Sequence, residues 1–197
     1  MRVAGVIIAG GRSARMGSCK AWLTVGGSTL LARTIERITP QVTALALNVN
    51  GNPAVYAGLN LTLIADLHPD IGTPLAGLHA GLSWVRQQGF DALASMPCDC
   101  PFLPHDLVSR LASANADAAI AASSGQPHFL TGLWSHTLLE KLEQAIGTGQ
   151  TVRVKDWAAS TGAARIEWPS QPYDPFFNIN TPEQLAEANR TAAEFGL

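Results

Sequence analysis

The sequence predicts an α/β protein with a mostly parallel central sheet. Short apolar segments alternate with segments whose apolar residues recur at helical spacing, and several apolar segments end in a glycine or a polar residue. The chain has 197 residues, of which 47% are hydrophobic and 14% charged, as expected for a folded chain with a sizeable core. Because no repeat and no long Pro/Gly/Ser linker divides it, we expect residues 1–197 to form a single domain.

The strands are predicted by short runs of Val, Ile, Leu and Ala. The first run leads directly into Gly10 and Gly11 and is typical of a strand buried on both faces. The last is a candidate antiparallel strand. The predicted strands cover residues 3–9, 42–48, 61–65, 91–95, 117–122 and 129–134.

The helices are predicted by apolar residues three or four positions apart, together with helix-start signals. Thr73 followed by Pro74 has the form of an N-cap and a first-turn proline, and residues 181–184 form a capping box. Pro40 ends the first helix. The predicted helices cover about residues 31–38, 74–85, 107–111, 138–146 and 182–194.

Several predicted strands end in residues suited to ligand binding. Asn48, Asp66 and Asp99 follow three strands, as Gly10 and Gly11 follow the first. Ligands of open α/β sheets bind at the carboxyl ends of the strands. We therefore expect these four strand ends to share one crevice.

Charge and composition exclude several classes of protein. Lys and Arg number 13 against 15 Asp and Glu, a net charge of −2, and no basic run occurs. This favours neither nucleic acid nor an anionic membrane as a partner. No apolar stretch is long enough to span a bilayer, and the first residues lack a convincing signal peptide. The three cysteines (Cys19, Cys98 and Cys100) are an odd number in a chain of this length, so we expect a reducing, cytoplasmic location.

The most informative segment is the glycine-rich stretch over residues 9–20. Its glycines allow backbone N–H groups to approach phosphate oxygens, and Arg12, Arg15 and Lys20 supply positive charge. We interpret it as a polyphosphate cradle; the alternative is a glycine-rich surface turn with solvated cations. It is neither a Walker A loop nor a dinucleotide-binding G-x-G-x-x-G fingerprint.

Asp99 is the second candidate element, a carboxylate between Pro97 and Pro101 at a strand end. A single rigid carboxylate suits Mg²⁺, which keeps most of its other ligands as water and substrate phosphate. The alternative is that Asp99 only caps the following helix. Cys98 and Cys100 lack a second cysteine pair, so a zinc site is poorly supported.

Two further segments are weaker candidates. Residues 72–78 would present free backbone N–H groups at a helix start, and Asn178 and Asn180 lie on the same side of an extended segment before a helix. The asparagines have ordinary turn residues as their alternative. The histidines show no ligand spacing and no G-x-S-x-G elbow occurs, so acyl-transfer hydrolysis is not supported.

Together these segments resemble the bacterial molybdenum cofactor guanylyltransferases, the MobA proteins, within the nucleotidyltransferases. The resemblance runs almost end to end and implies a three-layer, Rossmann-like nucleotidyltransferase fold. The broad group is indicated by the first loop alone, the narrower family by its combination with the later segments. The matching residues are 8–11, 15–17, Lys20, 26–27, Asn48, Asp66, 74–77, 97–99, 101–104 and 178–182.

The resemblance implies transfer of GMP from GTP to molybdopterin or its molybdenum form, with release of pyrophosphate and with Mg²⁺ as cofactor. Asp99 would hold the metal and Lys20 the phosphates. The candidate protein partners are cofactor-insertion proteins and acceptor molybdoenzymes. The nucleotide would be bound by Ile8, Ala9, Gly10, Gly11, Asn48 and Asp66, and the pterin side would include Gly77, Asn178 and Asn180.

This chemistry needs no general base, because the attacking group is already a phosphate anion. Catalysis then consists of alignment and charge neutralisation, a role we assign to Arg15 and Lys20. Two positions depart from the family pattern: Cys19 stands where an aspartate usually precedes Lys20, and Phe129 follows His128 where a proline is common. We interpret His128 as structural.

Two other functions remain open from the sequence. One is a sister nucleotidylyltransferase that uses CTP or a sugar phosphate, since residue types do not determine the base. The other is a carrier that binds nucleotide or cofactor without turnover.

Overall fold

The computed structural model describes residues 1–9, 20–147 and 152–197 of the chain. Gly10, Gly11, Arg15 and Cys19 lie outside the described residues. The central sheet has seven strands in the order β5-β4-β1-β6-β8-β7-β9. They are β1 (Val3–Ile8), β4 (Ala44–Asn48), β5 (Thr62–Ile64), β6 (Ala92–Pro97), β7 (Ala118–Ser123), β8 (Gln126–Ser135) and β9 (Ala164–Trp168).

The predicted mostly parallel sheet is confirmed. Strands β5, β4, β1 and β6 are parallel to one another, and β7 is parallel to β9. In this described sheet only β8 is antiparallel to both strands beside it, β6 and β7. Ser124 and Gly125 join β7 to β8 with positive φ values of 48° and 74°, which a two-residue hairpin turn requires. The candidate antiparallel strand is therefore correct, although it is longer than predicted.

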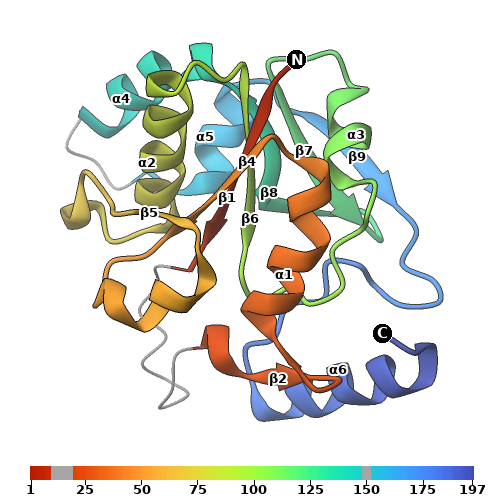
Figure 1. Ribbon diagram of the computed structural model, residues 1–197. Coiled ribbons are helices and arrows are strands. Elements are labelled where there is room, and N and C mark those ends of the chain that lie inside the picture. The colour runs from red at the N-terminus through yellow and green to blue at the C-terminus, as the bar shows by residue number, and fades with distance from the viewer. Residues whose placement is uncertain (10–19, 148–151) are drawn as a thin grey trace.

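Helices cover both faces of the sheet, so the fold has three layers (Figure 1). Leu31 of α1 and Leu107 of α3 pack with one face of the strands, while Leu78 of α2, Leu142 of α4 and Trp157 of α5 pack with the other. The helices are α1 (Leu30–Ile38), α2 (Pro74–Gln87), α3 (Leu107–Ala112), α4 (Leu139–Gly147), α5 (Val154–Ser160) and α6 (Pro182–Phe195).

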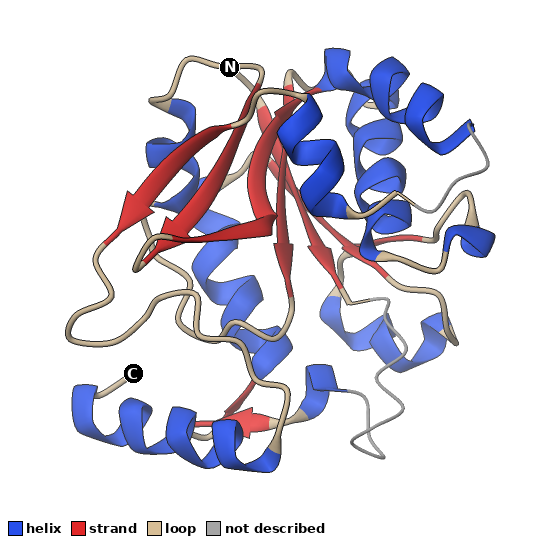
Figure 2. Ribbon diagram, turned by 180° about the vertical axis from the view of Figure 1, so that it is seen from behind, coloured by secondary structure: helices blue, strands red, loops and turns tan. Residues whose placement is uncertain are grey.

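The C-terminal helix packs away from these layers, with a small hairpin of β2 (Thr24–Val25) and β3 (Ser28–Thr29). Figures 1 and 2 show both elements beyond the carboxyl ends of the parallel strands. Their shared core contains Val25, Ile179 and Ala188, all fully buried. This packing places the C-terminal part of the chain near the edge of the sheet where the strand-end residues lie.

Four elements differ from the sequence prediction. Strand β6 extends to Pro97, which pairs with Ile8, because a proline at the last strand position removes a donor only where pairing ends. The β2–β3 hairpin, α5 and β9 were not predicted: the hairpin strands have two residues each, and β9 is a half-exposed edge strand.

Among the described helices, none is long and apolar enough to cross a membrane.

Candidate active site

The site is built on the carboxyl edge of four adjacent parallel strands. Asp66 follows β5, Asn48 ends β4, Ala9 follows β1 and Asp99 follows β6, and these strands are neighbours in that order. Lys20 begins the short 3-10 helix η2 (Lys20–Trp22), which resumes the described chain after β1. The structure groups the described candidates into two clusters, one around Asp99 and one around Asn48.

The first cluster contains an ion pair between Lys20 and Asp99. Lys20 Nζ lies 3.3 Å from Asp99 Oδ2, and each side chain is only 15% exposed. Burial raises the pKa of the Asp99 carboxyl above its usual value, and the nearby Lys20 charge opposes this rise. Within the described ranges, Asp99 Oδ1 is buried and has no hydrogen-bond partner. This oxygen is a free hard donor of the kind that Mg²⁺ prefers.

The C-terminal segment completes this cluster. Lys20 Nζ donates to Asn180 Oδ1 at 2.5 Å, and Asn180 Nδ2 donates to Asn178 Oδ1 at 2.9 Å. The Ile179 N–H donates to the carbonyl oxygen of Asp99 at 3.1 Å. The two asparagines thus meet on one side of their segment, as predicted, and the segment is tied to both members of the ion pair.

The second cluster is centred on Asn48, which is fully buried. Asn48 Nδ2 donates to Asp66 Oδ1 at 2.9 Å and to the Ile64 carbonyl oxygen at 3.3 Å. Asn50 Nδ2 donates to the other Asp66 oxygen at 2.6 Å, and the Asp66 N–H donates back to Asn50 Oδ1 at 2.9 Å. Asn50 was not a sequence candidate; the N-x-N spacing, which puts it on the same side as Asn48, was its only signal.

Gly77 lies against Asn48. A Cβ at position 77 would be 2.5 Å from Asn48 Oδ1 and 3.1 Å from Ile8 Cγ2. Helix α2 therefore approaches the strand end closely because position 77 has no side chain. The resemblance associates Gly77 with Asn178 and Asn180, whereas the structure puts it beside Ile8 and Asn48.

Two further residues considered in the sequence analysis, Cys100 and His128, have contacts typical of structural residues. Cys100 is buried with Sγ 3.6 Å from the Phe176 carbonyl oxygen, and burial raises the pKa of its thiol well above the usual value. His128 Nε2 lies 2.8 Å from Ser123 Oγ, its ring packs on Phe176, and burial lowers its pKa. In the part of the chain that the structure describes, no group of three or more His, Cys, Asp or Glu side chains is placed to hold a metal ion.

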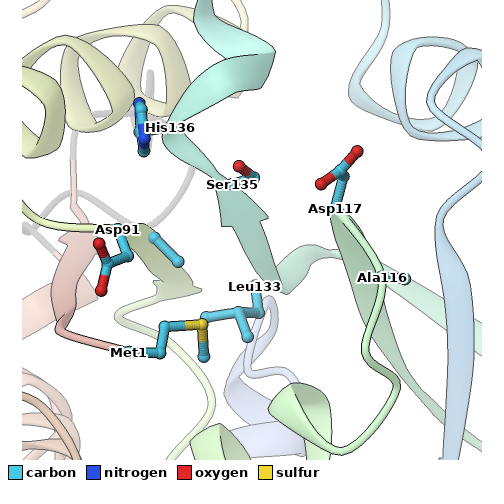
Figure 3. A pocket seen from close by; sticks show the side chains of 8 residues that line it. Met1, Asp91, Ala116, Asp117, Leu133, Ser135 and His136 are labelled. Atoms are coloured by element: carbon cyan, nitrogen blue, oxygen red, sulfur yellow. The ribbon is translucent and has the colours of Figure 1, made fainter.

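A separate cavity of about 260 Å³ opens at the opposite, amino edge of the parallel strands (Figure 3). It contains none of the predicted site residues. The residues that line it are Met1, Asp91, Ala92, Ala116, Asp117, Leu133, Ser135 and His136.

Known proteins match nearly the whole chain. The profile of the MobA-like NTP transferase domain matches residues 5–163. A molybdenum cofactor guanylyltransferase of Nitrobacter hamburgensis is 44% identical over 196 residues, which cover 96% of this chain and 94% of the relative. One of Rhodopseudomonas palustris is 46% identical, covering 95% of this chain and 92% of the relative.

Solved structures share the fold. The molybdopterin-guanine dinucleotide biosynthesis protein A of Archaeoglobus fulgidus superposes with a TM-score of 0.74 at 23% identity, covering 98% of this chain and 100% of that one. The 2-C-methyl-D-erythritol 4-phosphate cytidylyltransferase of Thermus thermophilus superposes with a TM-score of 0.72 at 20% identity, with the same coverage. The nucleotidyltransferase fold predicted for this chain is confirmed.

Proposed function

Because the chain belongs to the molybdenum cofactor guanylyltransferase family of MobA-like NTP transferases, we propose that it transfers GMP from GTP to molybdopterin or its molybdenum form. The products are pyrophosphate and the guanine dinucleotide form of the cofactor. Among the geometric features, the observation that carries this function is the largely buried Lys20–Asp99 ion pair, which lies at the edge of the sheet where ligands of such sheets bind.

Lys20 neutralises charge on the triphosphate. Its ammonium lies 3.3 Å from Asp99 Oδ2 and keeps hydrogen-bond capacity beyond its two protein acceptors, Asp99 and Asn180. The terminal phosphate of the pterin attacks as an anion, so these residues align the reactants and compensate charge without removing a proton. We assign Arg15, which lies outside the described residues, a parallel role on the departing pyrophosphate.

Nucleotidyltransferases of this family generally use a divalent metal ion, and we propose Mg²⁺ held by Asp99. The donor set fits: Asp99 Oδ1 is buried and unpaired among the described atoms while Oδ2 is held by Lys20. One protein carboxylate is enough for an ion that takes its other ligands from phosphate and water. When bound, the metal would stabilise negative charge that develops on the phosphates.

The nucleotide and pterin contacts follow from the family resemblance. We propose that Ile8, Ala9, Gly10, Gly11, Asn48 and Asp66 bind the guanine nucleotide. Asn178 and Asn180 are proposed to contact the pterin. The family resemblance implies the same role for Gly77, which in this structure packs on Asn48. Cofactor-insertion proteins and acceptor molybdoenzymes are the proposed protein partners, and the cytoplasmic location stays a prediction.

A nucleotide panel tests this function. Pyrophosphate release is measured with GTP, CTP, ATP and UTP, each with molybdopterin and Mg²⁺, and the product is checked by mass spectrometry for the guanine dinucleotide. We expect turnover with GTP alone. Turnover with CTP but not GTP would identify a sister cytidylyltransferase. Binding of GTP and Mg²⁺ without turnover, given authentic pterin and a competent acceptor enzyme, would favour the carrier.

A further inference from the structure

Gln184, in the first turn of α6, makes a hydrogen bond in addition to those that cap the helix. Its Oε1 accepts from the Thr181 N–H at 3.1 Å, while Thr181 Oγ1 accepts from the Gln184 N–H at 3.3 Å, which is the reciprocal pattern of a capping box. The same Oε1 also accepts from the Asn180 N–H at 2.7 Å, its shortest contact. Gln184 therefore fixes the backbone of the residue that precedes the cap.

Fixing Asn180 matters because its side chain reaches the ion pair. Asn180 Oδ1 accepts from Lys20 Nζ at 2.5 Å, compared with 3.3 Å from Lys20 Nζ to Asp99 Oδ2. Asn180 Nδ2 is held by Asn178 Oδ1, which sets the direction in which Oδ1 points. Gln184 therefore holds the backbone of Asn180, and the Asn180 side chain in turn binds Lys20, which also contacts Asp99.

A lysine needs such an anchor more than most residues. Its ammonium is a point charge on a flexible stem with several rotatable bonds, so one carboxylate contact leaves it free to change rotamer. The second acceptor, Asn180 Oδ1, comes from a segment 160 positions away in sequence. Asn180 Oδ1 therefore keeps the ammonium from moving closer to Asp99, whose Oδ1 has no hydrogen-bond partner among the described atoms.

We propose that Gln184 is a positioning residue for Lys20: it holds Asn180 in place, and Asn180 holds the ammonium where the triphosphate must meet it. This rests on the proposed function in one respect, that the triphosphate is the ligand of Lys20. The position of the ammonium can be measured without that function.

The test compares three variants. Gln184→Ala removes the acceptor, and Gln184→Glu keeps an oxygen for the same two N–H groups. Ala186→Gly is the matched control, because Ala186 is exposed within α6 and glycine there destabilises the helix to about the same degree as a lost cap. Gln184→Met, which keeps the side-chain length without the oxygen, replaces Gln184→Ala if the latter does not fold.

Two readouts are taken on each folded variant. The first is kcat and KM for GTP in the pyrophosphate-release assay. The second is the rate at which a small succinimidyl ester acylates Lys20 in the ligand-free protein, measured by peptide mass spectrometry relative to exposed Lys155.

For Gln184→Ala we expect Lys20 acylation to rise and kcat/KM for GTP to fall, each by roughly five- to tenfold, the size of one lost hydrogen bond between neutral groups. Gln184→Glu and Ala186→Gly are expected to stay near wild type in both readouts. If Gln184→Ala and Ala186→Gly change both alike, Gln184 is only a helix cap and the proposal is overturned. A wild type without GTP turnover refutes the proposed function instead, and the acylation rates still decide the role of Gln184.

Discussion

Substituting Gly77 by alanine tests how closely α2 must approach Asn48. Two effects oppose each other: alanine favours a helix interior over glycine by about 1 kcal/mol, and Gly77 has no positive φ that an alanine would strain. Against this, the new Cβ would lie 2.5 Å from Asn48 Oδ1, and Asn48 is fully buried with its amide held by Asp66 and Ile64. Overpacking of this kind costs about 1–3 kcal/mol, and a displaced hydrogen bond about 1 kcal/mol more.

We therefore expect Gly77→Ala to lower the free energy of unfolding by about 1–3 kcal/mol and Tm by about 2–12 °C. Urea and thermal unfolding measure both. Gly81→Ala in the same helix is the matched control, because its Cβ would meet the flexible end of Leu93 at 3.0 Å and gains the same helix propensity. Because the displaced Asn48 is a proposed nucleotide contact, KM for GTP should rise in Gly77→Ala and not in Gly81→Ala.

A double-mutant cycle isolates the clash. In an Asn48→Ala background the crowding oxygen is absent, so adding Gly77→Ala should stabilise the protein by up to about 1 kcal/mol. The sign of the effect is therefore expected to reverse between the two backgrounds. Equal stabilisation by Gly77→Ala with and without Asn48 would refute the reasoning.

Three other changes have expected outcomes. Burial raises the pKa of Asp99, so the folded state binds that proton more tightly than the unfolded chain does, and stability falls as pH rises through the pKa of the folded state. Asp99→Asn should therefore raise the urea midpoint at pH 8 and lose that advantage as pH falls below the usual carboxyl pKa. The same variant should reduce Mg²⁺-dependent turnover at least about 100-fold. Unchanged turnover at saturating Mg²⁺ would remove Asp99 from the mechanism. Lys20→Ala should raise KM for GTP by about 10- to 100-fold, and equal GTP affinity and rate would contradict its placement. Buried His79 has a pKa lowered by burial and by His68, with Glu143 opposing, so stability should fall as pH drops below about 6.5. Because burial also lowers the pKa of His128, His79→Leu should reduce that slope without abolishing it, and an unchanged slope would assign it to other groups. We expect no large loss of stability at pH 8, because neither ring nitrogen of His79 has a hydrogen-bond partner among the described atoms and Glu143 Oε1 lies 3.7 Å from Nε2.

Much of the fold was predictable because local signals are strong where strands and helices are buried. The apolar runs of β1 and β4 and the caps at Thr73 and Thr181 locate their elements to within a few residues. The hairpin at Gly26–Gly27 escaped prediction because its strands have two residues each. Edge strand β9 has only five residues; its apolar and polar residues alternate, a signal that the sequence prediction missed. Both elements are short, so packing against the rest of the chain is needed to stabilise them.

The residue types that follow each parallel strand can be read from the amino-acid sequence, and because such strands end at one edge of the sheet, Asn48, Asp66 and Asp99 were expected to share that edge. Which of them are in contact became known from the three-dimensional packing. The Asn48–Asp66 and Lys20–Asp99 contacts, the pairing of Lys20 with Asn180 and the reach of Gln184 to the Asn180 backbone join segments whose distance apart is set by packing. Periodicity describes one element at a time, whereas these contacts depend on the pairing of β4 with β5 and on how α6 and the segment before it pack beyond the strand ends.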